Sequence, residues 1–242
     1  MFTRAKQSRV FQDVVEQIQD AIMSGKLEPG SKLPAERELK DMFNTSRGTL
    51  REALRVLEQK GLIEIKLGVS GGAIIKRIDT GIMMESMALL IRSGEVSLEH
   101  LAEFRIKTEG TIVELATQRA GKKDIKELEK LFNRAKAYYE QSDWENFLKT
   151  DEKMHTYIGI MTRNPVFQFV QKTIHDNIHL YYNEYLPMAQ DRSLENLMDF
   201  KKIIDAMKAG DAAAASEIIQ DHIKRFNDKM LEENKGKALN PL

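Results

Sequence analysis

Apolar residues recur at helical spacing through the first 60 residues, and polar or glycine breaks divide them into three short helices. The first helix covers residues 11–22 and ends before Gly25, and the second covers residues 34–43 after a Pro-Gly turn. Ser46 is a natural N-cap for the third helix, which ends at Gly61. The inward stripe of this third helix consists of Leu50, Ala53, Leu54 and Leu57.

Two short apolar segments follow, and glycines separate them. Residues 62–67 and 73–78 have the composition of strands, and Gly68-Val69-Ser70-Gly71-Gly72 between them suits a tight, exposed tip. Three helices followed by a two-stranded ribbon predict a winged helix-turn-helix. In that module the third helix lies in the major groove of DNA, and the wing contacts the adjacent backbone or minor groove.

Beyond residue 80 the hydrophobic pattern is helical throughout. Breaks containing Gly, Pro or Asn separate seven segments, at 81–92, 97–119, 123–141, 143–162, 165–186, 192–209 and 211–234. None of these segments alternates with a period of two. We therefore expect a mainly α protein whose C-terminal part is an antiparallel bundle of about six or seven helices.

Charge separates the same two regions. The 242 residues include 37 Lys and Arg against 37 Asp and Glu, so the chain is formally neutral. Residues 1–78 hold 14 basic and 10 acidic residues, a net charge of +4, while residues 79–242 hold 23 and 27, a net charge of −4. We expect a DNA-binding domain over 1–78 and a domain for effector binding and dimerisation over 79–242.

Composition excludes several classes of protein. The chain has no cysteine, which removes disulfide frameworks, thiolate zinc sites and cysteine nucleophiles. Its apolar runs are far shorter than the ~18 to 20 residues that span a bilayer. We expect a cytoplasmic protein with no membrane partner.

The N-terminal end of the third helix carries candidate DNA contacts. Free backbone N–H groups at a helix start favour phosphate, and Ser46, Arg47 and Thr49 lie at that end. Arg47 and Arg51 are one turn apart, and an arginine fork matches guanine O6 and N7. The alternative is an ordinary solvated helix face.

Ionisable residues interrupt the apolar stripes of three helices in the C-terminal part. Arg105 lies on the inward face of one helix with Glu109 one turn further on, Asp151 and His155 lie on a second helix, and His222 lies on the last. Such groups are rarely buried unless they are paired, bind a metal or face a wet cavity. We expect one internal polar pocket.

The spacing of these residues allows a metal site. Asp151 and His155, four residues apart on one helix, can hold a single divalent ion, and His222 would add a third ligand. Open coordination positions would then remain for water or a small carboxylic acid effector, whose carboxylate Arg105 could bind. The alternatives are a local Asp–His hydrogen bond and an ion pair of Arg105 with Glu109 or Asp151.

A second histidine pair lies at His175 and His179. Both residues flank the apolar line of their helix, which favours a surface or subunit contact. A role for His175 as a replacement metal ligand stays open.

The motifs of the first part form a long, ordered set. They are Pro29-Gly30, Leu33-Pro34-Ala35-Glu36-Arg37-Glu38-Leu39 and Ser46-Arg47-Gly48-Thr49-Leu50-Arg51-Glu52-Ala53-Leu54. This set resembles the GntR superfamily of bacterial transcription regulators. The resemblance implies that the wing near Gly68 reaches the groove and that DNA is contacted by Arg37, Ser46, Arg47, Thr49 and Arg51. Gly48 departs from the larger polar residue common in FadR-like members, which puts the operator sequence read there in doubt.

The C-terminal part resembles the helical ligand-binding (FCD) domain of the FadR-like branch. The resemblance rests on Glu103-Phe104-Arg105 with Glu109, Asp151-x-x-x-His155, Asn164-Pro165, Ala206-x-x-x-Gly210-Asp211 and His222. Many members of that branch hold zinc or nickel through one Asp and three His beside a small organic acid. By this resemblance Asp151, His155 and His222 are metal ligands, and Phe200 stands where those members have the fourth.

Phe200 leaves two possibilities open for the pocket. Either a weakened metal site persists with three protein ligands, or the site is vestigial and the pocket takes a more hydrophobic acid. In both cases we expect Arg105, Glu109 and Phe200 to contact the effector.

The leading hypothesis is a homodimeric, ligand-responsive transcription regulator, a repressor rather than an enzyme, that binds a roughly palindromic operator. One alternative is a metal-dependent enzyme that uses Asp151, His155 and His222, although no paired general acid and base accompany them. Another is a constitutive DNA-binding dimer whose pocket is only structural.

Overall fold

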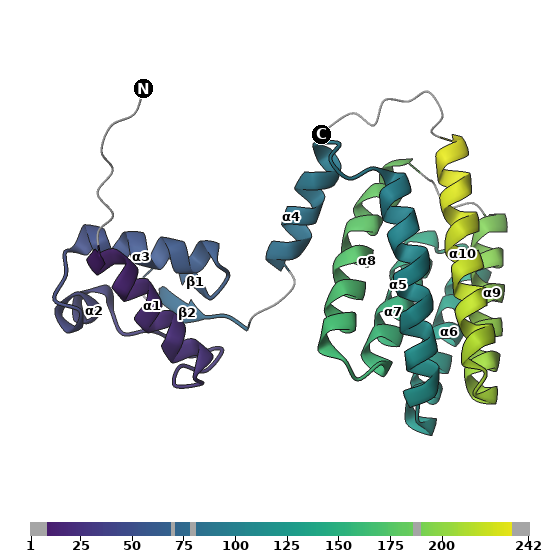
Figure 1. The fold of residues 1–242 in the computed structure, drawn as a ribbon, viewed down its shortest axis with the longest axis horizontal. Coiled ribbons are helices and arrows are strands. Elements are labelled where there is room, and N and C mark those ends of the chain that lie inside the picture. Colours follow the sequence, from purple (N-terminus) through teal and green to yellow (C-terminus); the bar gives the residue numbers. More distant parts are fainter. Residues whose placement is uncertain (1–8, 69–70, 78–80, 186–189, 234–242) are drawn as a thin grey trace. The chain divides into compact units, whose positions relative to one another are not determined.

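The structure is a computed structural model that describes residues 9–68, 71–77, 81–185 and 190–233. The chain divides into two compact units, Met1–Ile82 and Met83–Leu242. This division falls four residues beyond the boundary expected from charge and texture. Figure 1 shows the two units, each of which is described by itself below.

The first unit contains three helices and a two-stranded sheet, as predicted (Figure 1). The helices are α1 (Arg9–Met23), α2 (Glu36–Met42) and α3 (Arg47–Gln59), and the strands are β1 (Ile63–Lys66) and β2 (Gly72–Ile75). The strands are antiparallel, with Ile63 opposite Ile75 and Lys66 opposite Gly72. An additional isolated bridge pairs Lys32 with Ile74, at a place where the sequence suggested only a turn.

Local chemistry accounts for the ends of α3 and α2. The Ser46 hydroxyl accepts a hydrogen bond from the Thr49 N–H at 3.1 Å, which caps α3 as expected. Helix α2 starts at Glu36 rather than Pro34, because the Glu38 carboxylate accepts a hydrogen bond from the Ala35 N–H and so fixes Ala35 just outside the helix. The predicted stripe of α3 forms the centre of this unit's core, where Leu50, Ala53 and Leu57 are fully buried.

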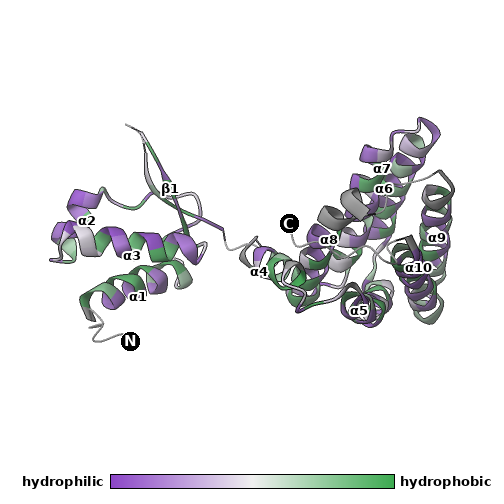
Figure 2. Ribbon diagram, turned by 90° about the horizontal axis from the view of Figure 1, so that it is seen from above, coloured by the Kyte–Doolittle hydropathy of each residue, from purple (hydrophilic) through white to green (hydrophobic). Residues whose placement is uncertain are grey.

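The second unit contains seven helices among the described residues, in agreement with the predicted bundle. They are α4 (Gly81–Arg92), α5 (Leu98–Arg119), α6 (Lys122–Glu140), α7 (Trp144–Met161), α8 (Pro165–Tyr185), α9 (Gln190–Ala209) and α10 (Ala212–Glu233). Their ends lie within two residues of the predicted bounds. Figure 2 shows hydrophobic and hydrophilic positions alternating around these helices, the pattern of amphipathic helices that share one core.

Helices α5 and α10 run side by side (Figures 1 and 2), and a glycine brings them close together. A Cβ atom on Gly110 would lie 2.3 Å from the Gln220 side chain, so a larger residue at this crossing would have to displace that side chain. The Ser216 hydroxyl also donates to the Gly110 carbonyl at 3.0 Å. This contact fixes the part of α5 that carries Glu109.

The main core of the second unit lies among α5, α6, α7, α9 and α10. Its largest fully buried side chains include Phe147, Met154, Ile158 and Phe200. A smaller apolar cluster of Ile91, Leu101, Ile174 and Ile178 joins α4, α5 and α8. In the described part of the chain, no helix has the length and hydropathy needed to cross a membrane.

Candidate functional sites

The exposed face of α3 carries the predicted DNA-contacting residues. Arg47 and Arg51 are exposed, and the capping hydroxyls of Ser46 and Thr49 lie 2.8 Å apart at the start of the helix. The Arg51 Nε atom donates to a Glu36 carboxylate oxygen at 2.8 Å, which ties α3 to α2. The structure therefore brings Ser46, Arg47 and Thr49 together at one helix end and gives Arg51 an acidic partner.

The other two predicted DNA contacts lie outside α3. Arg37 is exposed near the start of α2. Gly68 opens the turn between the two strands of the wing with φ of 106°, and the Gly71 N–H donates to its carbonyl at 2.9 Å. A Cβ on Gly71 would lie 2.2 Å from the Lys66 carbonyl oxygen, so this turn requires glycine there. Val69 and Ser70, at the tip, lie outside the described residues.

The second unit encloses a polar cavity of about 20 Å³, which is room for one ion or water molecule. The predicted residues Arg105, Asp151, His155 and His222 all line it. The other lining residues are Leu148, Glu152, His175, Ile178, Asn196 and Phe226. Helices α5, α7 and α10 therefore do bring their ionisable residues to one place, with α8 and α9 completing the wall.

Glu109 is fully buried and its carboxylate accepts four hydrogen bonds. Arg105 Nε donates to Oε1 at 2.8 Å, as in the structural ion pair considered from the sequence. Oε2 lies 2.9 Å from His155 Nδ1, 3.0 Å from Gln171 Nε2 and 3.1 Å from His175 Nε2. Glu109 is not among the residues that line the cavity, and its carboxylate is held by internal hydrogen bonds. Its contact with an effector stays a prediction.

The charge of Glu109 is stabilised by these partners. Burial alone would raise the pKa of its carboxyl, but the imidazoles of His175 and His155 and the Arg105 guanidinium outweigh burial and hold that pKa well below its ordinary value. Glu109 is therefore ionised at neutral pH. An ionised carboxylate accepts hydrogen bonds from its partners, so the nitrogen that His155 presents to it is Nδ1–H.

Asp151 has the opposite environment. Burial raises the pKa of its carboxyl, although His155, His222 and Arg105 act against the rise. Among the described residues, its buried Oδ1 atom has no hydrogen-bond partner. Its other oxygen, Oδ2, lies 3.9 Å from His155 Nε2, which carries a lone pair when Nδ1 carries the proton. Two acceptors thus face each other across the cavity, an arrangement that a proton or a cation would stabilise.

His222 is buried in the cavity wall, with its ring centroid 5.5 Å from that of His155. Its Nδ1 lies 3.2 Å from Oδ2 of Asp199, a residue of α9 that is itself 5% exposed. The Arg225 guanidinium donates to the same oxygen, and Lys202 lies 3.8 Å from the other one. Sequence patterns gave no sign of Asp199, because its role follows from how α9 packs against α10.

His175 corrects one prediction. The sequence favoured a surface or subunit contact, but the His175 side chain is 4% exposed and its ring stacks on His155 with centroids 4.2 Å apart. Helix α8 packs against α7 and α5, so this flanking residue contacts Glu109 and His155 in the interior. The side chain of His179 lies outside the part of the chain that the structure describes.

Phe200 lies beside the predicted metal ligands. Its fully buried ring packs edge-on against His155 at 4.9 Å and against His222 at 5.8 Å between centroids. It therefore occupies the space next to both imidazoles without offering a ligand atom.

Comparison with known proteins identifies the chain. Residues 11–71 match the family model described as bacterial regulatory proteins, gntR family, and residues 100–225 match the FCD domain. The chain belongs to the GntR family. Its second unit carries the FCD domain, and the polar cavity lies within it.

Relatives of this GntR regulator are named for control of transcription. The chain is 27% identical over 231 residues to the Uxu operon regulator of Haemophilus influenzae, covering 93% of this chain and 83% of that protein. It is 28% identical to the transcriptional repressor NanR of Citrobacter rodentium, over 87% of this chain and 81% of that one. The chain is thus a ligand-responsive DNA-binding transcription regulator and not an enzyme.

A solved structure supports the fold. The GntR protein of Streptococcus agalactiae superposes with a TM-score of 0.72 at 22% identity and covers 90% of this chain and 99% of that one. The predicted fold, a winged helix-turn-helix followed by a helical bundle, is confirmed.

The FCD domain of this GntR regulator has a group of residues that could hold a metal ion. Among the described residues, the ligand atoms of Glu109, His155 and His175 all lie within 4.8 Å of one another, and all three residues are buried. This group shares His155 with the set predicted from the sequence, which also contained Asp151 and His222. The two sets would use opposite nitrogens of the same imidazole, because Nδ1 faces Glu109 and Nε2 faces Asp151.

Proposed function

We propose that this protein is a homodimeric repressor that binds a divalent metal, zinc or nickel, together with a small organic acid in the FCD cavity. Binding there alters the affinity of the winged helices for a roughly palindromic operator. The observation that carries the proposal is the Asp151 carboxylate in a cavity lined by His155 and His222. Among the described residues its Oδ1 atom has no hydrogen-bond partner, and its Oδ2 atom lies 3.9 Å from His155 Nε2. Such a buried carboxylate atom requires a proton or a cation.

The metal is assigned to Asp151, His155 and His222 rather than to Glu109, His155 and His175. The Glu109 carboxylate already accepts four N–H groups, so a cation there would displace satisfied hydrogen bonds. Asp151 Oδ2 and His155 Nε2, 3.9 Å apart, are close to the ~3.4 Å expected of two ligands each ~2.1 Å from one tetrahedral ion. One carboxylate oxygen and two imidazoles suit zinc or nickel, and the bound ion would supply Lewis acidity and open positions for an acid.

The acid is assigned to the same cavity because Arg105 lines it. The Arg105 Nε atom donates a hydrogen bond to Glu109, and this hydrogen bond fixes the orientation of the guanidinium. An acid bound between Arg105 and the ion would contact residues of α5, α7 and α10 at once. Different affinity of the acid for two arrangements of these helices would couple the cavity to DNA binding.

The repressor assignment and the two-fold operator draw on the family. NanR relatives are named as repressors. A dimer with two-fold symmetry presents its two recognition helices to two half-sites of inverted orientation.

The metal assignment is tested by measuring zinc binding to the full chain, first freed of metal, by isothermal titration calorimetry. We expect one zinc per chain in the wild type, a loss of at least about 100-fold in affinity in His222→Ala and a change within about tenfold in His175→Ala. The two variants are matched, since each removes one buried imidazole from the cavity wall. Retained binding in His222→Ala with loss in His175→Ala would move the metal to the Glu109 group.

The effector role is tested by thermal shift of the zinc-loaded protein against a panel of small organic acids, followed by operator binding with any acid that stabilises it. We expect at least one acid to raise the Tm and to change operator affinity by about 5- to 150-fold. If no acid does so, the constitutive DNA-binding dimer is the correct description.

A further inference from the structure

We infer that Glu109 and Asp199 are positioning residues: each accepts the Nδ1–H of one cavity histidine and thereby turns the Nε2 lone pair of that histidine toward the cavity. The inference deepens the proposed metal site and rests on it. It adds a function for Asp199, which no sequence pattern singled out, and it fixes the tautomer of both His155 and His222.

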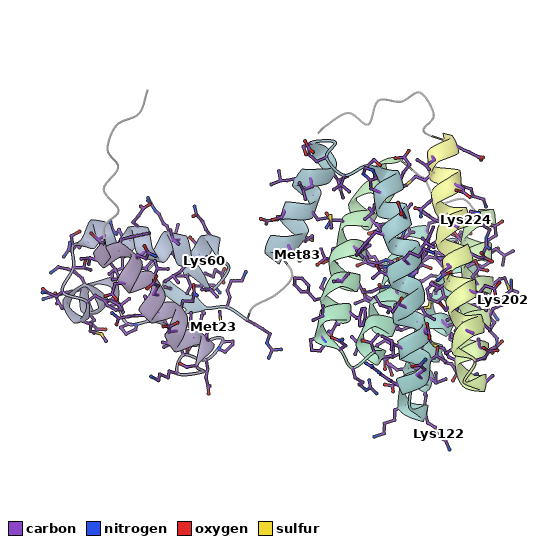
Figure 3. All side chains as sticks on the ribbon, viewed as in Figure 1. Met23, Lys60, Met83, Lys122, Lys202 and Lys224 are labelled. Atoms are coloured by element: carbon purple, nitrogen blue, oxygen red, sulfur yellow. The ribbon has the colours of Figure 1, made fainter. Side chains whose placement is uncertain are left out.

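The pair on α9 and α10 shows the arrangement. His222 Nδ1 lies 3.2 Å from Asp199 Oδ2, and the two side chains are 5% and 7% exposed. The Arg225 guanidinium and Lys202 hold the Asp199 carboxylate from the solvent side, where Lys202 lies on the outside of α9 (Figure 3). The Asp199 Oδ2 atom also accepts from the Arg225 guanidinium, so this carboxylate is the hydrogen-bond acceptor of the pair. A neutral His222 then presents Nδ1–H to it, which leaves Nε2 unprotonated.

Glu109 on α5 and His155 on α7 form a second pair of the same kind. Glu109 Oε2 lies 2.9 Å from His155 Nδ1, and Arg105 and Gln171 hold the carboxylate in place. His155 Nε2 is then the atom that lies 3.9 Å from Asp151. Two carboxylates from two different helices thus each face Nδ1 of one imidazole, which leaves Nε2 of both rings as the nitrogen for a ligand.

A metal bound at Nε2 requires this tautomer, with the proton on Nδ1 and the lone pair on Nε2. A metal-bound histidine usually donates its second N–H to a carboxylate, which fixes the ring and raises the basicity of the ligand nitrogen. Without that acceptor the imidazole proton can move to Nε2, which blocks coordination. The residue after Asp199 is Phe200, whose ring packs against both imidazoles, so α9 holds the site by orientation and packing without contributing a ligand of its own from that position.

The inference is tested on the full chain with Asp199→Ala and Asp199→Asn. Nitrogen NMR of ¹⁵N-histidine-labelled, metal-free protein reports which imidazole nitrogen carries the proton, and calorimetry with zinc alone reports affinity. In the wild type we expect Nδ1–H on His222. In Asp199→Ala we expect a shift toward Nε2–H and a loss of about 10- to 100-fold in zinc affinity. Asp199→Asn keeps an oxygen acceptor, so we expect the wild-type tautomer and a smaller loss.

The control is Asp205→Ala, which removes the same charge from the same helix at an exposed position paired with Lys201. We expect both measurements to match the wild type. Nε2–H on His222 in the wild type, or an unchanged tautomer and affinity in Asp199→Ala, overturns the inference. If Asp199→Ala does not fold, the wild-type and Asp199→Asn spectra decide it. Absence of zinc binding in the wild type would reject the proposed metal site, while the tautomer measurement would still decide the positioning role.

Discussion

At the scale of single residues, we expect Phe200 to set how strongly the proposed site binds a metal. Phe200 follows Asp199 in the sequence, and its ring packs against His155 and His222, the two histidines predicted to bind the metal. Its side chain has no atom that could coordinate a metal. Its ring instead buries apolar surface in the main core of the second unit. We therefore expect Phe200 to weaken metal binding while its packing stabilises the metal-free protein.

Phe200→His should raise zinc affinity and lower the stability of the metal-free protein. A fourth nitrogen beside His155 and His222 should raise zinc affinity by about tenfold or more, whereas an unsatisfied buried imidazole should destabilise the metal-free protein by about 1 to 3 kcal/mol. Calorimetry with zinc and urea unfolding with and without zinc measure the two effects. Phe200→Leu is the control and should lose packing with no gain in zinc affinity. Equal zinc affinity in the wild type and Phe200→His would place the metal away from this residue.

At the scale of elements, Asp124 joins the start of α6 to the turn between α7 and α8. Its Oδ2 atom accepts from the Gly121 N–H at 2.8 Å and from Arg163 NH2 at 2.6 Å. Burial would raise its pKa, but these two partners outweigh burial, and the pKa lies below the ordinary value of 3.8. Arg163 has a positive φ of 54°, so the side-chain contact also helps to hold an uncommon backbone conformation.

Asp124→Asn should lower the free energy of unfolding of the second unit by about 1 kcal/mol at pH 7, because Arg163 loses its charged partner. The effect is limited because the Arg163 side chain is half exposed. A lowered folded-state pKa stabilises the fold above the unfolded-state pKa, and this contribution fades as the pH falls through the folded-state value. The difference in the free energy of unfolding between variant and wild type should therefore be the same at pH 7 and pH 5 and should become smaller below about pH 4. Urea unfolding followed by circular dichroism measures it. Glu127→Gln, which breaks an exposed pair with Lys130 on the same helix, should have a smaller effect at every pH.

At the scale of the whole molecule, the neutral chain is the sum of a first part at +4 and a second part at −4. The excess of positive charge on the DNA-binding part is small. We therefore expect specific affinity to depend on a few placed arginines in each subunit of the proposed dimer rather than on a broad basic surface.

Arg47→Ala should consequently reduce specific operator affinity strongly. Loss of one bidentate contact costs about 1 to 3 kcal/mol, and a dimer loses it in each of two half-sites. Fluorescence anisotropy with operator and with scrambled DNA, at two salt concentrations, separates base reading from phosphate binding. Lys60→Ala is the control, since Lys60 lies at the far end of α3 and bonds to Gln19 (Figure 3). Unchanged operator preference in Arg47→Ala would remove the base-reading role from this residue.

The candidate site could be predicted only in part from the sequence. Arg105, Asp151, His155 and His222 interrupt apolar stripes, so helical periodicity alone placed them in the interior, and they do line one cavity. His175 was misplaced because it flanks its stripe, and flanking positions become buried or exposed according to which helix packs beside them. Asp199 gave no signal for the same reason, since a carboxylate next to a stripe is usually solvated.

The sequence by itself determined the elements, their order and the two-part organisation, because local spacing, caps and glycine turns act within a few residues. It also determined which residue types reach the interior of the helical unit. Only the tertiary structure decided which atoms face each other: that four donors occupy Glu109, that Asp151 keeps an unpartnered oxygen among the described residues, and that Asp199 orients His222. These relations join residues on different helices, and their geometry depends on how side chains pack across the core, which no local pattern encodes.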